Sequence, residues 1–205
     1  MLKISCFTGG MAQTNGYLLE TGPAALAVDA PEGMAEWLGQ QGNKVSHLLL
    51  THQHFDHCQD AAAIQRMGAR VLAFAPFSRE LTLEFLMGFV SGTRFEVEAF
   101  TVDEVLEGKE ALETAGVTWN LAHVPGHSLD SVTFYCEVEK ILMGGDVLFA
   151  GSIGRTDFPG GSLPTLLQGI QKHVLSLPHD TRVLPGHGPE TTIGEERDGN
   201  PYLQE

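Results

Sequence analysis

Short apolar runs, each ended by a polar or glycine-containing turn, recur along the whole chain. In the first thirty residues, the runs Leu2–Phe7, Tyr17–Leu19 and Ala24–Val28 have the length and the bounds of strands and predict a meander. A helix is predicted next, over residues 34–42, because Pro31-Glu32-Gly33 precedes its first apolar positions and a glycine ends it.

Strand, helix and strand then alternate. The apolar run Val45–Leu50 predicts a buried strand, residues 60–67 predict a short helix with Asp60 as its N-cap, and Arg70–Phe74 predicts another strand. This alternation is typical of an α/β fold, in which the chemistry lies at the carboxyl ends of the strands.

The middle of the chain has a helical pattern. Phe85, Leu86, Phe89 and Val90 are spaced as on one face of a helix, and such a stripe is expected to pack on a core. A mobile lid over a substrate is the alternative interpretation of this segment.

The second half repeats one arrangement, in which an apolar run stops and a turn with glycine presents a single His or Asp. The runs and their turns are Val117–Val124 before Pro125-Gly126-His127, Ile141–Met143 before Gly144-Gly145-Asp146, and Arg182–Leu184 before Pro185-Gly186-His187. Glycine lets the backbone approach closely and proline stiffens the turn, so each of these side chains is expected to be held rigidly. A further helix is predicted from Ser162 toward Val174, and the tail from Glu190 is predicted to be solvated surface.

Composition and charge narrow the function classes. At 205 residues, with 42% hydrophobic and 19% charged residues, the chain can bury a substantial core, and we expect one domain over residues 1–205. The formal net charge of −14 argues against a nucleic-acid surface, which needs clustered Lys and Arg. Because no apolar run is long enough to cross a bilayer and no leader pattern opens the chain, the sequence predicts a cytoplasmic protein with no membrane partner.

Cysteine usage agrees with that compartment. Cys6, Cys58 and Cys136 are far apart in the sequence and form no Cys-x-x-Cys pair. We therefore expect three buried free thiols and neither a disulfide framework nor a cysteine zinc site.

The densest group of chemically active side chains is Thr51-His52-Gln53-His54-Phe55-Asp56-His57, directly after the predicted strand at 45–50. No turn, cap or packing rule requires three imidazoles and a carboxylate within six residues. Both groups are common ligands of Zn²⁺ and of its first-row neighbours. The sequence therefore predicts a metal site on the loop that leaves this strand.

The single residues of the later turns are expected to join this site. The candidate ligands then number five His and two Asp: His52, His54, Asp56, His57, His127, Asp146 and His187. Because one tetrahedral ion needs only three or four protein ligands, the set suits two divalent cations, with Asp146 as the candidate bridge. Zn²⁺ is the expected metal and Fe or Mn are alternatives. Two such cations supply hydroxide near neutral pH, which is suited to hydrolysis of an acyl or phosphoryl compound.

The remaining histidines, which do not follow a strand at a glycine-containing turn, are expected to be hydrogen-bonded or solvated: His47, His123, His173 and His179.

With these residues, the chain resembles the metallo-β-lactamase fold hydrolases over nearly its whole length. The resemblance implies a four-layer αβ/βα sandwich with a dinuclear site at one edge of the two sheets. It implies that His52, His54 and His127 bind the first metal and that Asp56, His57 and His187 bind the second. It further implies that Asp146 bridges the two metals and that Asp56 has a catalytic role in orienting the attacking hydroxide.

A narrower resemblance follows from the segments after Asp146. Gly144-Gly145-Asp146 with Gly154-Arg155-Thr156-Asp157-Phe158-Pro159-Gly160 is similar to the glyoxalase II group, and Gly188–Glu195 is similar to its short bacterial members. Those enzymes hydrolyse thioesters such as S-lactoylglutathione, so a small thioester is the implied partner. We expect no C-terminal helical domain of the kind that helps full-length members bind glutathione.

One departure from that group concerns substrate binding. The Lys and Tyr contacts of glyoxalase II in the loop after the bridging Asp are replaced here by Arg155 and by the Asp157-Phe158 pair. Arg155 is the expected substrate-binding residue, because its planar fork matches a carboxylate. A structural ion pair within the loop is the alternative.

Persulfide dioxygenases give the alternative function. They are similar in carrying Gly-Arg-Thr-Asp-Phe after the bridging Asp, and they use a single Fe(II) held by residues that match His52, His127 and Asp146. The continuation Phe158-Pro159-Gly160 favours the hydrolase. The sequence indicates neither the acyl group, nor the thiol carrier, nor the oligomeric state.

Overall fold

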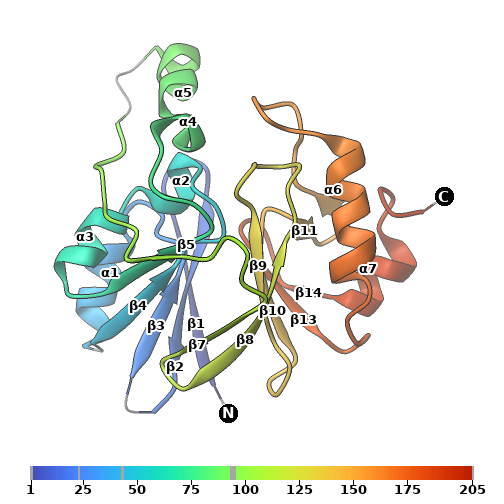
Figure 1. Ribbon diagram of the computed structural model, residues 1–205, viewed down its shortest axis with the longest axis horizontal. Coiled ribbons are helices and arrows are strands. Elements are labelled where there is room, and N and C mark those ends of the chain that lie inside the picture. Colours follow the sequence, from blue (N-terminus) through green and yellow to red (C-terminus); the bar gives the residue numbers. More distant parts are fainter. Residues whose placement is uncertain (1, 23, 43, 93–95, 205) are drawn as a thin grey trace.

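Two six-stranded sheets pack face to face, and helices cover the outer face of each sheet (Figure 1). This computed structural model describes residues 2–22, 24–42, 44–92 and 96–204. The layers run helix, sheet, sheet, helix, which confirms the predicted α/β class and the four-layer αβ/βα sandwich. Among these residues no helix is long and apolar enough to span a bilayer.

The first sheet has the order β1-β2-β3-β4-β5-β6. Its strands are β1 (Lys3–Gly9), β2 (Thr14–Glu20), β3 (Ala25–Val28), β4 (Val45–Leu49), β5 (Arg70–Ala73) and β6 (Glu104–Val105). The predicted meander is confirmed for β1 to β3, which pair antiparallel, and the strands from β3 to β6 pair parallel. The helices α1 (Met34–Gln41) and α3 (Ala61–Arg66) lie on its outer side, and α2 (Phe55–Cys58) lies at the upper end of its strands (Figure 1).

The second sheet has the order β14-β13-β10-β9-β8-β7. Its strands are β7 (Ala111–Thr114), β8 (Val117–His123), β9 (Val132–Cys136), β10 (Ile141–Gly145), β13 (Arg182–Pro185) and β14 (Thr191–Thr192), and β11 (Leu148–Phe149) with β12 (Ser152–Ile153) forms a separate hairpin. Its outer face carries α6 (Leu163–Gly169), which continues into the π-helix η1 (Ile170–Val174), and α7 (Ile193–Gly199). Strand β10 pairs parallel with β13 and antiparallel with β9, so β8, β10 and β13 all end at the same edge.

The core follows from the alternation of side chains along each strand. In β4, Leu48 packs in the layer between the first sheet and its helices, whereas the next residue, Leu49, packs between the two sheets. In β10, Leu142 packs against the helices of the second sheet, and Met143 faces the first sheet. Burial on both faces explains why these strands read as continuous apolar runs.

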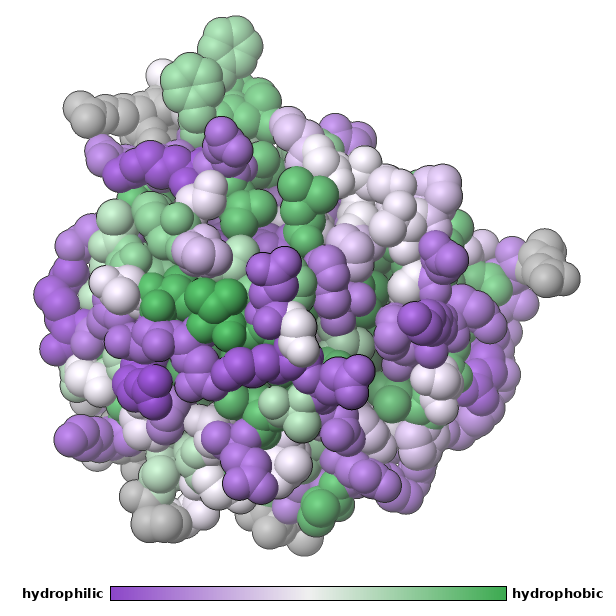
Figure 2. Space-filling model, in the orientation of Figure 1, coloured by the Kyte–Doolittle hydropathy of each residue, from purple (hydrophilic) through white to green (hydrophobic). Residues whose placement is uncertain are grey.

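The segment before residue 93 corrects one prediction. The expected helix exists as α5 (Glu84–Ser91), preceded by α4 (Arg79–Thr82), but its apolar stripe does not pack on the core. Phe85, Phe89 and Val90 are 87%, 83% and 70% exposed, and apolar side chains accordingly gather over α5 at the top of Figure 2. Only the side of α5 that carries Met87 contacts the core.

Three smaller predictions need correction. Asp60 occupies the N-cap position of α3 as predicted, but its side chain makes no capping hydrogen bond; its carboxylate accepts instead from the backbone N–H of Ala35 in α1. Cys6 is exposed on the edge strand β1, whereas Cys58 and Cys136 are buried thiols as predicted. The polar tail contains α7, where Thr192 and Glu195 form a capping box and Glu196 is buried.

Candidate metal centre

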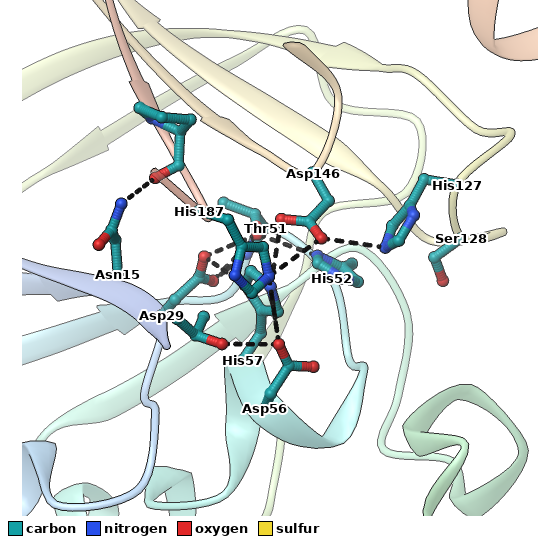
Figure 3. A network of polar contacts seen from close by, with 12 residues as sticks. Asn15, Asp29, Thr51, His52, Asp56, His57, His127, Ser128, Asp146 and His187 are labelled. Carbon is teal, nitrogen blue, oxygen red and sulfur yellow. Dashed lines mark hydrogen bonds and ion pairs between the residues drawn. The ribbon is translucent and has the colours of Figure 1, made fainter. Parts of the chain in front are cut away.

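The seven predicted ligand residues meet at the edge where β4, β8, β10 and β13 end, and Figure 3 labels all of them except His54. Their ligand atoms fall into three overlapping groups, and within each group the atoms lie within 4.8 Å of one another. The groups are His52 with His54 and His127, His52 with His57 and Asp146, and Asp56 with His57 and His187. Each sheet therefore supplies part of the cluster.

Asp146 lies at the centre of the cluster. Its Oδ2 is 3.4 Å from Nε2 of His127 and 3.3 Å from Nε2 of His187, and its Oδ1 is 3.3 Å from Nε2 of His57. One carboxylate thus faces histidines of both metal-binding sets that the resemblance implies. This is the position that a bridging ligand would need.

Two glycines make this close approach possible. A Cβ at Gly186 would lie 2.2 Å from Oδ1 of Asp146 and 2.5 Å from Cε1 of His57, so no larger residue fits beside the ligands. Gly145 has φ +51°, and a Cβ there would lie 2.5 Å from Oγ1 of Thr51. The glycine-containing turns are therefore needed for the two sheets to approach each other at the site.

Asp29, which the sequence analysis missed, organises the site from behind. Its carboxylate accepts hydrogen bonds from the backbone N–H and the hydroxyl of Thr51, and it lies 2.9 Å from Nδ1 of His57. Like the predicted ligands, Asp29 directly follows a strand, β3, and that position was the available signal. Buried partners of this kind fix the orientation of metal-binding imidazoles.

Thr14 and Asn15, at the start of β2, were also missed. The hydroxyl of Thr14 donates to Oδ2 of Asp56 at 2.6 Å. Asn15 donates from its side chain to the carbonyls of Pro185 and Gly188, and from its backbone N–H to the carbonyl of Gly186. These bonds tie the loop of His187, which belongs to the second sheet, to the first sheet.

The donor set fits bound metal ions. The Nε2 atoms of His52, His57 and His127 and the Oδ1 atom of Asp146 are buried, and none of them has a hydrogen-bond partner among the described residues. Their other atoms are engaged: Nδ1 of His127 lies 2.8 Å from the carbonyl of Arg155, and Nδ1 of His52 lies 3.1 Å from the hydroxyl of Thr51. Several buried unsatisfied nitrogens that face a carboxylate are costly unless a cation satisfies them.

Without a cation, the protein's own groups shift the pKa values of the two sets of histidines in opposite directions. Burial, with the neighbouring imidazoles, lowers the pKa of His54 to about 3 and lowers that of His52 well below its usual range. Burial also opposes charge on His187, but hydrogen bonds to Asp146 and Asp56 outweigh it and raise the pKa to about 9. The pKa of His57 is raised in the same way, against burial, chiefly by the charge of Asp146.

The carboxylate of Asp56 stays ionised in this environment. Burial raises its pKa, but the charge of His57 and hydrogen bonds with His187 and Thr14 outweigh burial and lower the pKa to about 2. Asp56 is therefore an ionised hydrogen-bond acceptor at neutral pH, not an acid, and its carboxylate could serve as a metal ligand.

Arg155 lies on the loop after β12, beside the cluster. Its guanidinium binds both carboxylate oxygens of Asp157, at 2.7 Å each, and stacks 4.0 Å from the ring of Phe158. The ring of Phe158 in turn meets that of His54 edge to face at 5.9 Å. The loop ion pair weighed as the alternative is thus present, and substrate binding by Arg155 stays a prediction.

The histidines that the sequence analysis set aside lie elsewhere. Nδ1 of His47 is 2.9 Å from the hydroxyl of Ser46, and Nε2 of His123 is 2.8 Å from the carbonyl of Leu129. His173 is half-buried and His179 is exposed. None of these four is in the ligand groups.

A family model described as the metallo-beta-lactamase superfamily matches residues 10–187, which include every residue of the cluster. The chain belongs to the metallo-beta-lactamase superfamily. It is a metal-dependent hydrolase of that superfamily, with clusters of His and Asp that can hold metal.

Relatives within the superfamily have different described activities. The hydroxyacylglutathione hydrolase GloC of Haemophilus influenzae is 35% identical, with 93% of each chain covered. The crystal structure of the B3 metallo-beta-lactamase BLEG-1 is 34% identical with a TM-score of 0.87, covering 99% of this chain and 100% of that one. The structure of TTHA1623 in a di-iron-bound form is 33% identical with a TM-score of 0.83, covering 97% and 100%.

Proposed function

We propose that the protein hydrolyses small thioesters, such as S-lactoylglutathione, at a dinuclear metal centre. The observation that carries this proposal is the central position of Asp146, whose two oxygens face His57 on one side and His127 and His187 on the other. Two sets of ligands that share one carboxylate are the arrangement that a pair of divalent cations requires. The similarity to GloC over nearly the whole chain supports a thioester as the substrate class.

The roles of the chain's residues follow from their contacts. His52, His54 and His127 would hold one metal, and Asp56, His57 and His187 the other, with Asp146 shared between them. When bound, the metals supply a hydroxide nucleophile at neutral pH and stabilise the oxyanion of the reacting carbonyl. Zn²⁺ is the metal we propose, and the di-iron form of TTHA1623 makes Fe the first alternative to test.

Asp56 is the residue to which we assign orientation of the attacking water. Its Oδ2 accepts a hydrogen bond from the Thr14 hydroxyl at 2.6 Å, which fixes the carboxylate, and its depressed pKa keeps it ionised. Arg155 would offer its guanidinium to a carboxylate of the substrate, and Asp157 would release it in that event. Such an exchange keeps the arginine's bidentate geometry.

The test is the release of thiol from S-lactoylglutathione by protein loaded with Zn²⁺ or with Fe²⁺, beside an Asp146→Ala variant. The expected result is turnover by the loaded protein and a loss of about 10³-fold or more in the variant, because the shared ligand is gone. A chromogenic cephalosporin is assayed in parallel, because of the likeness to BLEG-1. No thiol release by the loaded protein would contradict the proposal, and oxygen uptake with a persulfide would favour the dioxygenase instead.

A further inference from the structure

A cavity of about 190 Å³ opens directly beside the metal cluster. His54 forms one side of it, Leu81 and Leu83 of the α4 segment form a second, and Leu129 with Pro159 forms a third. Of the described residues that line it, Glu80 alone carries a formal charge. The cavity therefore offers an apolar surface next to a metal ligand, with an acidic group and no cation on its lining.

The α4 wall is tied to the ligand loop by Gln53, which lies between His52 and His54 in the sequence. The buried side chain of Gln53 donates from Nε2 to the backbone carbonyls of Ala75 and Pro76, and its Oε1 accepts from the backbone N–H of Ser78. The hydroxyl of Ser78 then caps α4. The wall and the metal ligands are thus parts of one hydrogen-bonded unit.

The opposite wall is held equally firmly. The carbonyl of Leu129 is bonded to Nε2 of His123, whose ring stacks on Phe74 at 3.9 Å. The hydroxyl of Ser128 donates to Asp130 at 2.5 Å, so it is not free to face the cavity as a donor. A Cβ at Gly160 would lie 2.9 Å from the Leu129 side chain, which shows how closely the two loops of this wall pack.

We propose that this cavity is the acyl subsite of the enzyme and that it selects short, apolar, uncharged acyl groups. This inference rests on the proposed thioester hydrolysis and names its substrate class. Leu81, Leu83 and Leu129 would cover an alkyl or aryl group, while the reacting carbonyl lies beside His54. An anionic acyl group would meet Glu80 and find no cation on the lining.

The size of the cavity assigns it to the acyl group and not to the thiol carrier. An apolar cavity of about 150 Å³ holds a group the size of benzene. This cavity is similar in volume, and Leu81, Leu83 and Leu129 form part of its lining. A group of about six heavy atoms therefore fits. A peptide thiol such as glutathione is several times larger, so it would have to lie outside.

The test uses thioesters that share one neutral thiol, N-acetylcysteamine, and differ in the acyl group. Acetyl, butanoyl, hexanoyl, phenylacetyl and succinyl thioesters are compared by kcat/KM with the metal-loaded protein. A fully buried methylene contributes roughly a fourfold gain, and hexanoyl has four more methylenes than acetyl. Even at about twofold for each, hexanoyl should exceed acetyl by about tenfold or more, whereas succinyl should not exceed acetyl. Turnover of every thioester with a flat or inverse dependence on acyl length would overturn the subsite and leave thioester hydrolysis standing.

A matched pair of variants connects the preference to this cavity. Leu129→Trp adds bulk at a residue that lines the cavity and should fill part of it. Because the Leu129 side chain is 58% exposed, the substitution should not disturb the core. The hexanoyl-to-acetyl ratio of kcat/KM should then fall at least about fivefold. Val138→Trp adds the same group to a 90% exposed residue in the turn between β9 and β10, at the other end of the sandwich. Its ratio should equal that of the unmodified protein. An equal fall in both variants, or in neither, would overturn the assignment.

Ligand binding to the cavity can also be measured without catalysis, which separates the proposed acyl subsite from the proposed thioester hydrolysis. Binding of hexanamide and of acetamide is followed by NMR in the loaded protein and in Leu129→Trp. The hydrophobic lining predicts tighter binding of hexanamide and its loss in Leu129→Trp, even where no thioester is turned over. Equal affinity for the two amides would overturn the apolar subsite, whatever the fate of the proposed reaction.

Discussion

Oδ2 of Asp29 lies 2.9 Å from Nδ1 of His57, so a carboxylate at the end of β3 fixes the ring of a residue in α2. The same carboxylate accepts from the backbone and the hydroxyl of Thr51, the residue before His52. The contact with Asp29 favours the tautomer that keeps Nδ1 protonated and leaves Nε2 free to face Asp146. Asp29 is thus a positioning residue for ligands of both proposed metals.

Asp29→Asn tests this role. Asparagine tolerates the left-handed backbone that Asp29 adopts at φ +57°, so the substitution changes the hydrogen bonding more than the conformation. We expect metal affinity to fall about 10- to 100-fold and the free energy of unfolding to fall by about 1–3 kcal/mol. Competition with a chromophoric chelator and thermal unfolding measure these two quantities. Wild-type affinity in the variant would remove Asp29 from the site.

Gly186→Ala tests the close approach of the two sheets. The added Cβ would lie 2.2 Å from Asp146 and 2.5 Å from His57, so the loop must move and at least one ligand with it. We expect loss of one of two bound metals, measured by elemental analysis after gel filtration. Gly39→Ala is the control, because a Cβ there meets nothing within 4 Å in α1, and it should raise stability by about 0.5–1 kcal/mol without changing metal content. Two metals per chain in Gly186→Ala would show that the contact is not critical.

The opposing pKa shifts predict a stability maximum for protein stripped of metal with a chelator. The pKa values of His52, His54 and His127 are lowered in the folded protein. Below about pH 6.5 the unfolded chain therefore binds more protons than the folded protein, and stability falls as the pH falls. Above that pH, the folded protein retains protons on His57 and on His187, whose pKa is about 9, so stability falls as the pH rises. Thermal unfolding from pH 5 to 9 should therefore peak near the middle of the range. In the metal-loaded protein the loss of stability at alkaline pH should disappear, since metal-bound imidazoles have already lost their protons. An identical loss with and without metal would show that these histidines do not cause it.

Gln53→Ala tests the link between the ligand loop and α4. The variant removes three partly buried hydrogen bonds of the buried Gln53 side chain, to Ala75, Pro76 and Ser78, and should lower the free energy of unfolding by about 2–4 kcal/mol. Gln65→Ala is the control, because Gln65 also makes three hydrogen bonds but makes them in contact with solvent, and its cost should stay below about 1 kcal/mol. Urea unfolding measures both variants, and equal costs would show that burial of the Gln53 amide adds nothing.

The ligand residues could be predicted from the sequence because few structural roles apart from metal binding bring so many imidazoles together. His52, His54, Asp56 and His57 follow one strand within six residues, and His127, Asp146 and His187 each follow a strand at a glycine turn. Parallel orientation of β8, β10 and β13 brings the last three to one edge of the second sheet, and the packing of the two sheets places the residues after β4 beside them.

The supporting residues could not be predicted in the same way. Asp29 directly follows β3 and Asn15 lies at the start of β2, both common positions for a polar residue. Their partners lie 28 and 170 residues away in the sequence. The exposure of α5 was missed for a related reason. The spacing of Phe85 and Phe89 places them on one face of a helix, but it does not say whether that face points to the core or to solvent. Contacts from elsewhere in the chain decide this, such as the hydrogen bond from the Val97 N–H to the Glu84 carboxylate.

The most direct test of a dinuclear thioester hydrolase is activity against metal content. Protein stripped of metal is titrated with Zn²⁺, and in a second series with Fe²⁺ under anaerobic conditions, while thiol release from the hexanoyl thioester of N-acetylcysteamine and from S-lactoylglutathione is followed. We predict no turnover without metal and a rise that reaches its plateau at two equivalents per chain, because the proposed ligands form two sets that share Asp146, whose oxygens face His57 and His187. Turnover by the stripped protein, or none on either thioester with two equivalents bound, would contradict a dinuclear thioester hydrolase.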